Sequence, residues 1–389
     1  MPTFQRFDAA DCRFPPPRVP LLPVLRRGDL TLARTAAARA LDGTGVRHFS
    51  RGRYALHAAY RAAGVGTNGA LMAPAYHCRT MLDPALALGG EVVFYAIDEC
   101  LRPDLKAIAA LLAKAQPPVK ALLVPHYFGF RQLTETIAAL AGLCRSHGVT
   151  LIEDCSHGWQ IAIEHGPRCE EETGRMVVAS PYKFFPCPDG GTLWGNPTQL
   201  DPALTLSTSG PVKEFKALLK MLAPGLSGTS VGAAAAAGAP DARGLEHTET
   251  GALISLHYQR CLENQRGLAL SRWIVRHARA DNAAAQRRAN YRRWLTAVGA
   301  LNGARALFAE LPPDCIPYMF PLLIQAPDPQ FFKLKQLGMA VWRWDDMAVS
   351  DCRVAAKMRL HLLHLPCHQS LSDAQMGWMT STLAQMVAA

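Results

Sequence analysis

The sequence predicts an α/β fold, with a mostly parallel β-sheet in a large domain and a smaller α+β domain towards the C-terminal end. Strand-like and helix-like segments alternate over residues 44–200, and the strand-like segments are apolar throughout. Continuous apolar strands are typical of a sheet that helices cover on both faces. At 389 residues the chain is also longer than one simple core accommodates, which favours two domains.

The alternating elements follow one another in a regular order. Strands are expected at 69–76, 90–98, 119–129 and 149–156, and helices at 102–115 and 133–148. Pro103 and Asp104 are typical of a helix start, and Gly148 is typical of a helix end. Because ligands bind at the carboxyl ends of such strands, the residues that follow each strand are the first candidates for a functional site.

Composition divides the chain into three parts. Residues 1–43 indicate an N-terminal arm, with a proline-rich stretch and a helix-like segment at 30–41. Residues 44–264 are expected to form the large domain, and a segment rich in glycine and alanine near 223–245 would form a mobile loop within it. Residues 265–389 are expected to form the small domain.

Further elements are expected in the C-terminal part. The spacing of apolar and basic residues over 251–298 predicts helix, while 317–325 and 339–344 indicate strands. A helix is predicted for 372–388, because Ser372 and Asp373 supply typical N-cap side chains.

The composition is typical of a soluble globular enzyme. Hydrophobic residues make up 49% and charged residues 19% of the chain, and no apolar run is long enough to span a bilayer. Residues 1–30 contain acidic residues and a proline cluster where a signal peptide needs an unbroken apolar stretch, which favours a cytoplasmic protein. The eleven cysteines are scattered, so neither a disulfide framework nor a zinc site is expected.

The net charge of +10 raises the question of a nucleic-acid partner. The 41 basic residues are spread along the chain against 31 acidic ones, with short clusters at 26–27, 287–288 and 292–293. Arg287, Arg288, Arg292 and Arg293 are expected on a solvated helix face, where one of them could meet an acidic substrate. A small anionic substrate is therefore favoured, and neither a nucleic acid nor a membrane is expected as a partner.

The strand at 149–156 leads directly into two polar side chains. Asp154 and His157 follow the apolar run VTLI, at a place where turn residues are usual. A carboxylate and an imidazole at the carboxyl edge of a parallel sheet indicate a ligand site. A strand-end cap and a buried structural histidine are the simpler interpretations of the same two residues.

A lysine follows in the segment 177–196. Lys183 lies in an apolar stretch, three residues after Ser180 and six before Asp189-Gly190-Gly191. Apolar surroundings favour the free amine, as a nucleophile requires. A site for pyridoxal 5′-phosphate (PLP) needs a lysine for a Schiff base, a carboxylate against the pyridinium nitrogen and donors for the phosphate. Lys183, Asp154 and Ser180 can fill these roles.

Residues 48–65 offer a helix start for the phosphate. Gly52 precedes a helix-like run, so the amides of Gly52, Arg53 and Tyr54 can converge on an anion. The Arg53 side chain would add positive charge. The same pattern also fits a helix start without a ligand.

Taken in order, these segments resemble the DegT/DnrJ/EryC1/StrS family of PLP-dependent aminotransferases, which have the aspartate-aminotransferase fold, fold type I. The resemblance covers nearly the whole chain from about residue 45. It is carried by the segments FSRGRYALHAAYRAAG, MAPAYHCRTMLDPALALGGEVVFYAID, LLVPHYFG, LIEDCSH, SPYKFFPCPDGG and LPCHQSLSDAQM.

The resemblance implies a role for each matching residue. Lys183 would form the Schiff base with PLP and later move the proton, and Asp154 would pair with the pyridinium nitrogen. His157 would lie beside the 3-oxygen of the ring, and Ser180 with the amides at the helix start would bind the phosphate. The resemblance also implies a homodimer with sites at the interface, an amino donor such as glutamate and a nucleotide-linked keto-sugar acceptor.

The sequence departs from the family pattern at the cofactor ring and at the lysine. The family often places an aromatic residue where this chain has Cys78, so Tyr76 or His77 is expected to stack on the ring instead. The family lysine usually lies five residues after the serine, whereas Lys183 lies three after Ser180. The loop around the cofactor is therefore expected to differ.

The family loop that reaches the neighbouring subunit is not recognisable, and Asn264 and Arg266 are possible substitutes. His126 is expected to be structural, and Trp342 and Trp344 are expected in the core of the small domain.

The function implied is transfer of an amino group to a keto sugar, in polysaccharide or secondary-metabolite biosynthesis. One alternative is a PLP-dependent sugar dehydratase, but relatives with that activity replace the lysine by histidine. Another is a catalytically silent or regulatory member, which the missing aromatic residue and the missing loop would favour. The presence of both Lys183 and Asp154 favours catalysis.

Overall fold

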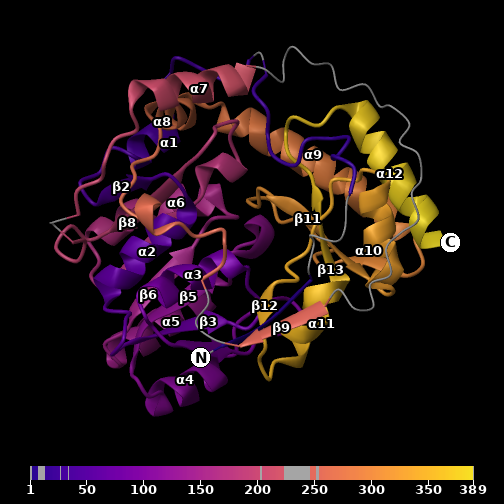
Figure 1. Cartoon of the computed structure of the whole chain (residues 1–389). Helices are drawn as coiled ribbons and strands as arrows, with labels where there is room; N and C mark the ends of the chain where they lie inside the picture. Colours follow the sequence, from indigo (N-terminus) through magenta and orange to yellow (C-terminus); the bar gives the residue numbers. More distant parts are fainter. Residues whose placement is uncertain are drawn as a thin grey trace.

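The computed structural model describes residues 2–7, 14–26, 28–33, 35–201, 204–222, 246–250 and 254–388, and the predicted loop at 223–245 lies outside these residues. Figure 1 shows two lobes. The large lobe, in indigo and magenta, surrounds a seven-stranded sheet, and the small lobe, in orange and yellow, surrounds a three-stranded sheet.

The seven-stranded sheet is mostly parallel. Its strands are β2 (Val46–Phe49), β3 (Ala70–Pro74), β4 (Val92–Tyr95), β5 (Val119–Pro125), β6 (Thr150–Asp154), β7 (Arg175–Ala179) and β8 (Gly191–Gly195). Their order across the sheet is β2-β8-β7-β6-β5-β3-β4. β8 is antiparallel to both of its neighbours, and the other pairs are parallel. The predicted α/β architecture is confirmed.

Helices connect and cover these strands. They are α2 (Gly52–Ala63), α3 (Arg79–Ala87), α4 (Leu105–Lys114), α5 (Thr134–Ser146) and α6 (Trp159–His165). α4 begins where the sequence indicates, because the Asp104 side chain accepts hydrogen bonds from the amides of Lys106 and Ala107. The predicted strands at 69–76, 90–98, 119–129 and 149–156 correspond to β3, β4, β5 and β6.

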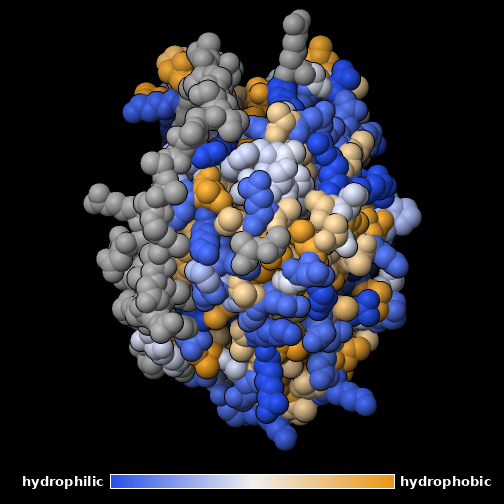
Figure 2. All heavy atoms as spheres, turned by 90° about the vertical axis from the view of Figure 1, so that its right-hand side faces the viewer, coloured by the Kyte–Doolittle hydropathy of each residue, from blue (hydrophilic) through white to orange (hydrophobic). Residues whose placement is uncertain are grey.

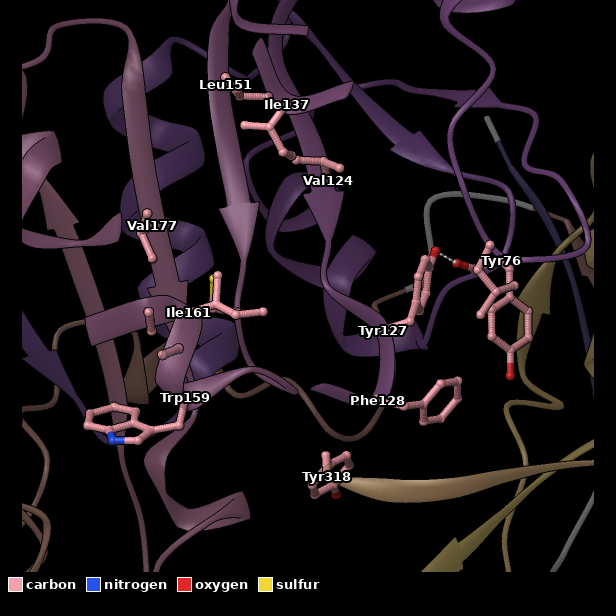
Figure 3. Packing of buried hydrophobic residues seen from close by; sticks show 14 of the residues in the cluster. Tyr76, Val124, Tyr127, Phe128, Ile137, Leu151, Trp159, Ile161, Val177 and Tyr318 are labelled. Carbon is pink, nitrogen blue, oxygen red and sulfur yellow. Dashed lines mark hydrogen bonds between the residues drawn. The ribbon is translucent and has the colours of Figure 1, made fainter. Parts of the chain in front are cut away.

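Both faces of the large sheet are buried. Along β6, Leu151 packs into one hydrophobic cluster and Ile152 into the other, as the alternation of side chains in a strand requires. Figure 3 shows part of the first cluster, in which Val124 and Val177 from the neighbouring strands lie with Leu151. Burial on both faces explains why the strands of this sheet are apolar throughout.

The small lobe is an α+β unit. β10 (Ala304–Ala306), β11 (Met319–Ile324) and β13 (Leu362–Pro366) form an antiparallel sheet, with α9 (Ala280–Gly299), α10 (Pro327–Gln336), α11 (Arg353–His361) and α12 (Asp373–Ala388) around it. Ser372 caps α12, because its hydroxyl accepts the Gln375 amide. On the face seen in Figure 2, hydrophilic side chains predominate and hydrophobic ones are interspersed.

Segments near the chain ends and between the lobes complete the fold. β1 (Thr3–Phe7), β9 (Glu246–Thr250) and β12 (Met347–Ala348) form a separate antiparallel sheet. The remaining helices are α1 (Ala36–Ala40), α7 (Pro211–Leu222) and α8 (Ala269–His277). Among the described residues, no helix combines the length and apolar character needed to cross a bilayer.

Three sequence predictions are wrong in detail. The helix expected at 30–41 is shorter, because α1 begins only after the cap at Thr35. The predicted helix over 251–298 begins at α8, since the chain before it bonds to other segments instead: the Gln265 carbonyl accepts the Ser50 amide, and the Arg266 amide donates to Ser207. The segment 339–344 is not a strand, because it pairs with β13 only at Trp342.

Candidate active site

The carboxyl ends of three neighbouring strands bring the predicted residues together. In the sheet register, Pro125 at the end of β5 pairs with Asp154 at the end of β6, which pairs with Val178 of β7. Ser180 directly follows β7, and Lys183 ends the single helical turn η4 (Pro181–Lys183) that comes next. The parallel sheet therefore delivers a carboxylate, a hydroxyl and an amine to one edge.

Asp154 is a buried carboxylate at the end of β6. Its side chain is 3% exposed, and Oδ1 accepts a hydrogen bond from the Ser156 amide at 2.8 Å. Within the residues that the structure describes, no basic side chain forms an ion pair with it. A buried charge is costly unless it is paired, so this carboxylate is suited to a positively charged group of a ligand.

Lys183 is half-buried at the sheet edge that carries Asp154. Its Nζ lies 5.3 Å from the centre of the Tyr318 ring. No hydrogen bond or ion pair engages Nζ among the described residues. Burial, followed by the nearby charge of Lys183, lowers the pKa of His157 well below its usual value and that of His364 to about 3. Both histidines are therefore neutral neighbours of an available amine.

His157 has a defined tautomer. The Phe128 amide donates to its Nδ1 at 3.3 Å, and its ring stacks on Tyr318 with the centres 4.4 Å apart. Because the ring is neutral and Nδ1 accepts, Nε2 carries the proton. His157 can thus donate one hydrogen bond to an oxygen, which is the contact expected of it beside a cofactor ring.

A glycine at the start of α2 forms a cradle with two serines. Gly52 is the first residue of α2, and a Cβ at this position would lie 2.1 Å from Ser180 Oγ. Ser180 Oγ donates to Ser156 Oγ at 3.0 Å. Amides at a helix N-terminus favour an anion, so this cradle suits a phosphate. Gly191 lets the start of β8 lie against the residue before α2, because a Cβ at position 191 would be 2.2 Å from the Arg51 carbonyl oxygen.

Two residues predicted for the phosphate direct their side chains elsewhere. The Arg53 guanidinium donates to the His257 carbonyl. The Tyr54 hydroxyl accepts from the Gln259 amide at 3.3 Å, and the Tyr54 amide donates to the Arg51 carbonyl at 3.1 Å. The two side-chain contacts are to residues outside the cradle, and the Arg53 guanidinium, expected to add charge there, bonds to a backbone carbonyl instead.

The two candidates for ring stacking have different surroundings. The Tyr76 ring lies 4.8 Å from that of Trp344, and its hydroxyl pairs with His364 Nε2 at 3.0 Å. His77 stacks on Phe94 at 5.3 Å and accepts the Ala348 amide. Tyr76 thus borders the site, whereas His77 packs between β4 and β12.

Aromatic side chains of the small lobe reach the site, and the sequence did not reveal them. Trp344 was expected in the core of the small domain, but its ring lies 5.6 Å from His157 and 5.2 Å from His364. In Figure 3, Phe128 follows β5 and Tyr318 lies just before β11, and the Tyr318 amide donates to the Phe128 carbonyl at 2.8 Å. We call His157, Tyr318, Trp344, His364 and Phe128 the aromatic enclosure. Of these five, His157 was predicted for the site from the sequence, and Phe128 lies at the end of the predicted strand 119–129.

Cys78 lies near Lys183 and Asp154. Burial raises the pKa of its thiol, while the charge of Lys183 opposes this rise and that of Asp154 adds to it. Its Sγ lies 3.0 Å from Thr80 Oγ1 at the start of α3. A small side chain therefore stands where the family pattern has an aromatic ring, and the aromatic side chains of the site come from other positions.

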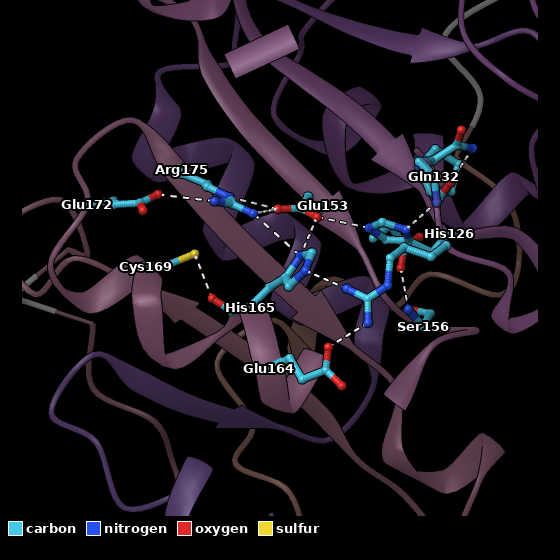
Figure 4. A network of polar contacts seen from close by, with 12 residues as sticks. His126, Gln132, Glu153, Ser156, Glu164, His165, Cys169, Glu172 and Arg175 are labelled. Carbon is cyan, nitrogen blue, oxygen red and sulfur yellow. Dashed lines mark hydrogen bonds and ion pairs between the residues drawn. The ribbon is translucent and has the colours of Figure 1, made fainter. Parts of the chain in front are cut away.

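A buried charge network supports the strand ends from the other face of the sheet (Figure 4). Glu153, which precedes Asp154 and points to the opposite face, accepts hydrogen bonds from His126 and His165 at 2.9 Å each and from Arg175 at 2.7 Å. Burial raises the pKa of Glu153, but these partners outweigh it and hold the pKa well below its usual value. His126 is structural, as the sequence indicated.

The same histidines and carboxylate are of the types that bind metal ions. However, the Gln132 amide donates to the second ring nitrogen of His126, and Arg131 donates to that of His165. Each histidine therefore directs its N–H, rather than a lone pair, towards Glu153. These hydrogen bonds fit a structural network that holds Glu153 better than they fit a metal site.

Comparison with known proteins identifies the family. The model of the DegT/DnrJ/EryC1/StrS aminotransferase family matches residues 42–270, which is more than half of the chain. The chain belongs to this family. Its members are PLP-dependent aminotransferases of fold type I, and the resemblance seen in the sequence is confirmed.

Individual relatives are distant. A "pleiotropic regulatory protein" of Geobacillus stearothermophilus is 29% identical over 172 residues, which are 42% of this chain and 42% of the relative. Among solved structures, the aminotransferase TlmJ from Streptoalloteichus hindustanus has a TM-score of 0.59 at 19% identity, covering 90% of this chain and 88% of its own.

Helicobacter pylori PseC, an aminotransferase involved in the biosynthesis of pseudoaminic acid, has a TM-score of 0.62 at 12% identity, with 93% of each chain covered. At these identities the two structures establish the fold. The residues of the candidate site also fit the family's cofactor, since the cradle at Gly52, the unpaired Asp154 and the unengaged Lys183 amine match its phosphate, ring nitrogen and aldehyde.

The cradle can be tested by adding a single carbon. Gly52→Ala places a methyl group against Ser180 Oγ and should weaken PLP binding by about tenfold, the equivalent of one hydrogen bond to a charged group. Fluorescence titration with PLP measures this. Gly142→Ala in α5, where no atom lies within 4 Å of the added carbon, is the control. Equal PLP affinity in the two variants would contradict the assignment.

The network around Glu153 predicts a pH-dependent stability. The pKa of Glu153 is depressed in the folded protein, so its contribution is present above about pH 4.5 and is lost as the pH falls through the folded-state value. Glu153→Gln should lower the free energy of unfolding by about 3 kcal/mol at pH 7, and this difference should shrink below pH 4.5. Urea denaturation at several pH values measures it. Glu172→Gln, at the exposed partner of Arg175, should change little.

Proposed function

We propose that the protein is a PLP-dependent aminotransferase that moves an amino group from an amino acid, with glutamate as the expected donor, to a keto sugar carried on a nucleotide. The proposed setting is polysaccharide or secondary-metabolite biosynthesis. One observation carries the proposal: among the described residues, Asp154 is buried without a cationic partner at the same sheet edge where no hydrogen bond or ion pair engages the Lys183 amine. Family membership supports it.

Each residue has a role that follows from its position. PLP, when bound, withdraws electrons from the carbon that carries the transferred nitrogen. Asp154 would hold a proton on the ring nitrogen, which keeps the ring electron-poor. Lys183 would hold the cofactor and then move a proton at the reacting carbon. His157 would donate from Nε2 to an oxygen, and Gly52 with Ser180 would bind the phosphate.

The aromatic enclosure supports a neutral reacting group on the acceptor. Burial raises the pKa of Tyr318, and of Tyr76 beside the enclosure, well above 10, and the pKa values of His157 and His364 are lowered, so these four side chains are uncharged at neutral pH. Uncharged aromatic walls exclude water and suit the apolar face of a sugar ring better than an ionised substrate.

The assembly and domain arrangement belong to the same proposal. We propose a cytoplasmic homodimer whose sites lie at the subunit interface, where the exposed Asn264 and Arg266 would approach the partner's site. We also propose that residues 44–264 act as the PLP-binding domain and 265–389 as the small domain, with residues 1–43 as an arm.

A regulatory role is the second candidate. The name of the Geobacillus relative favours it, although the match covers only 42% of that protein. The presence of Lys183 opposes the dehydratase alternative, because those relatives carry histidine at the lysine position. An intact lysine and carboxylate also distinguish the proposed catalyst from a silent member.

The visible absorption spectrum tests the proposal. Protein mixed with PLP should show an absorption band that Lys183→Ala abolishes, and glutamate should bleach the band because the amino group passes to the cofactor. Lys213→Ala, at an exposed position on α7, should behave as the wild type. A band that glutamate leaves unchanged would reject glutamate as the donor, and the absence of any band would favour the regulatory role.

A further inference from the structure

The turn that carries Lys183 is held by a buried arginine from the small lobe. Arg287 lies on α9 and is fully buried, although the sequence placed it on a solvated helix face. Its pKa is lowered by burial to about 10, so the guanidinium remains charged at neutral pH. The neighbouring Arg288 is only partly buried, which shows that the two arginines of this pair have different surroundings.

Five neutral acceptors surround the Arg287 guanidinium. Nε donates to the Gln369 side chain at 2.8 Å, and one terminal nitrogen donates to the carbonyls of Pro317 and Tyr318 at 3.1 Å each. The other donates to the carbonyls of Lys183 at 3.0 Å and Phe184 at 3.3 Å. A guanidinium has five N–H groups, so its hydrogen-bonding capacity is fully used.

These contacts connect the lysine turn to the small lobe. Gln369 also donates to the Phe184 carbonyl at 2.7 Å, so that carbonyl accepts from two side chains of the small lobe. Arg287 fixes the Tyr318 backbone as well, and the Tyr318 ring is the surface on which both Lys183 Nζ and His157 lie.

No carboxylate pairs with Arg287 in the part of the chain that the structure describes. A buried, unpaired cation is an expensive way to stabilise a fold, and an apolar side chain of similar size would often do as well. The contacts are instead concentrated on the backbone of the residue that the proposed reaction requires. The short Ser180-to-Lys183 spacing leaves one helical turn to place the amine. A side chain that holds this turn from outside therefore helps to determine where the amine lies.

We propose that Arg287, assisted by Gln369, is the positioning residue for Lys183: it clamps the Lys183–Phe184 backbone to Tyr318 and places a positive charge against the Lys183 carbonyl. This inference rests on the proposed function in one respect, that Lys183 is the residue to which PLP attaches. The clamp makes two separable contributions, a set of directional hydrogen bonds and a charge.

Substitutions separate the two contributions. Arg287→Met removes both, whereas Arg287→Lys keeps the charge but loses the planar array of donors. Arg288→Met is the matched control, because Arg288 lies next on the same helix and donates to the carbonyls of Pro312 and Cys315, without contacting the lysine turn.

Hydrogen–deuterium exchange without PLP tests the clamp itself. The amides of Lys183 and Phe184 are bonded within the turn, to Ser180 and Pro181. Arg287→Met and Arg287→Lys should speed exchange in the peptide 182–187 by at least about tenfold, the effect of losing hydrogen bonds from a charged donor. Arg288→Met should leave it unchanged. Gln369→Leu should give a smaller increase and serves if the Arg287 variants do not fold.

The pH titration of the Lys183-dependent absorption band tests the effect on the lysine. Loss of a nearby positive charge favours the protonated form of the linkage, so Arg287→Met should raise the midpoint by about one pH unit. Arg287→Lys should leave the midpoint near that of the wild type. A merely structural role would reduce the amount of folded protein without moving the midpoint.

The two measurements separate failure of the clamp from failure of the proposed function. If exchange at 182–187 is the same in Arg287→Met and Arg288→Met, the clamp is refuted whatever the spectrum shows. If exchange rises but the midpoint does not move, the hydrogen-bond contribution is supported and the charge contribution to the lysine is refuted. If the wild type forms no band, the proposed function fails, and exchange alone decides whether the clamp exists.

Discussion

The candidate site depends on one electrostatic constraint, the burial of the Asp154 carboxylate at the end of β6 with no positive partner in the part of the chain that the structure describes. Its neighbour Glu153 shows what the fold does with an ordinary buried carboxylate, since three side chains satisfy it on the other face of the sheet. The contrast between adjacent residues of one strand indicates that Asp154 is reserved for a cationic group from outside the chain. The pyridinium nitrogen of the family's cofactor is such a group.

The second structural theme is that the two lobes meet at the lysine. The large sheet supplies the carboxylate and the cradle, but Tyr318, Trp344 and His364 come from the small lobe, and Arg287 binds the backbone of Lys183 itself. A change in the position of the small lobe would therefore alter the aromatic enclosure and the lysine turn together. This connection offers a physical route by which substrate binding between the lobes could influence the amine.

The sequence was most informative where function depends on strand ends. Asp154 and Lys183 follow apolar strands, so their meeting at one sheet edge could be predicted from the order of elements. Arg287 and Trp344 were misplaced, because their burial depends on how the small lobe packs on the large one, and periodicity within a helix or strand contains no information about that contact. The contact of the Arg53 side chain could not be predicted either, since its carbonyl partner belongs to a segment about two hundred residues away in the chain.

The central claim is that Lys183 is the residue that binds the cofactor beside Asp154. Borohydride reduction of the protein with bound PLP, followed by mass spectrometry of its peptides, tests it most directly, because the reduction makes the attachment permanent. The account predicts one modified lysine, Lys183, and a much lower yield in Asp154→Asn. Attachment to another lysine, or no attachment at saturating PLP, would contradict the account.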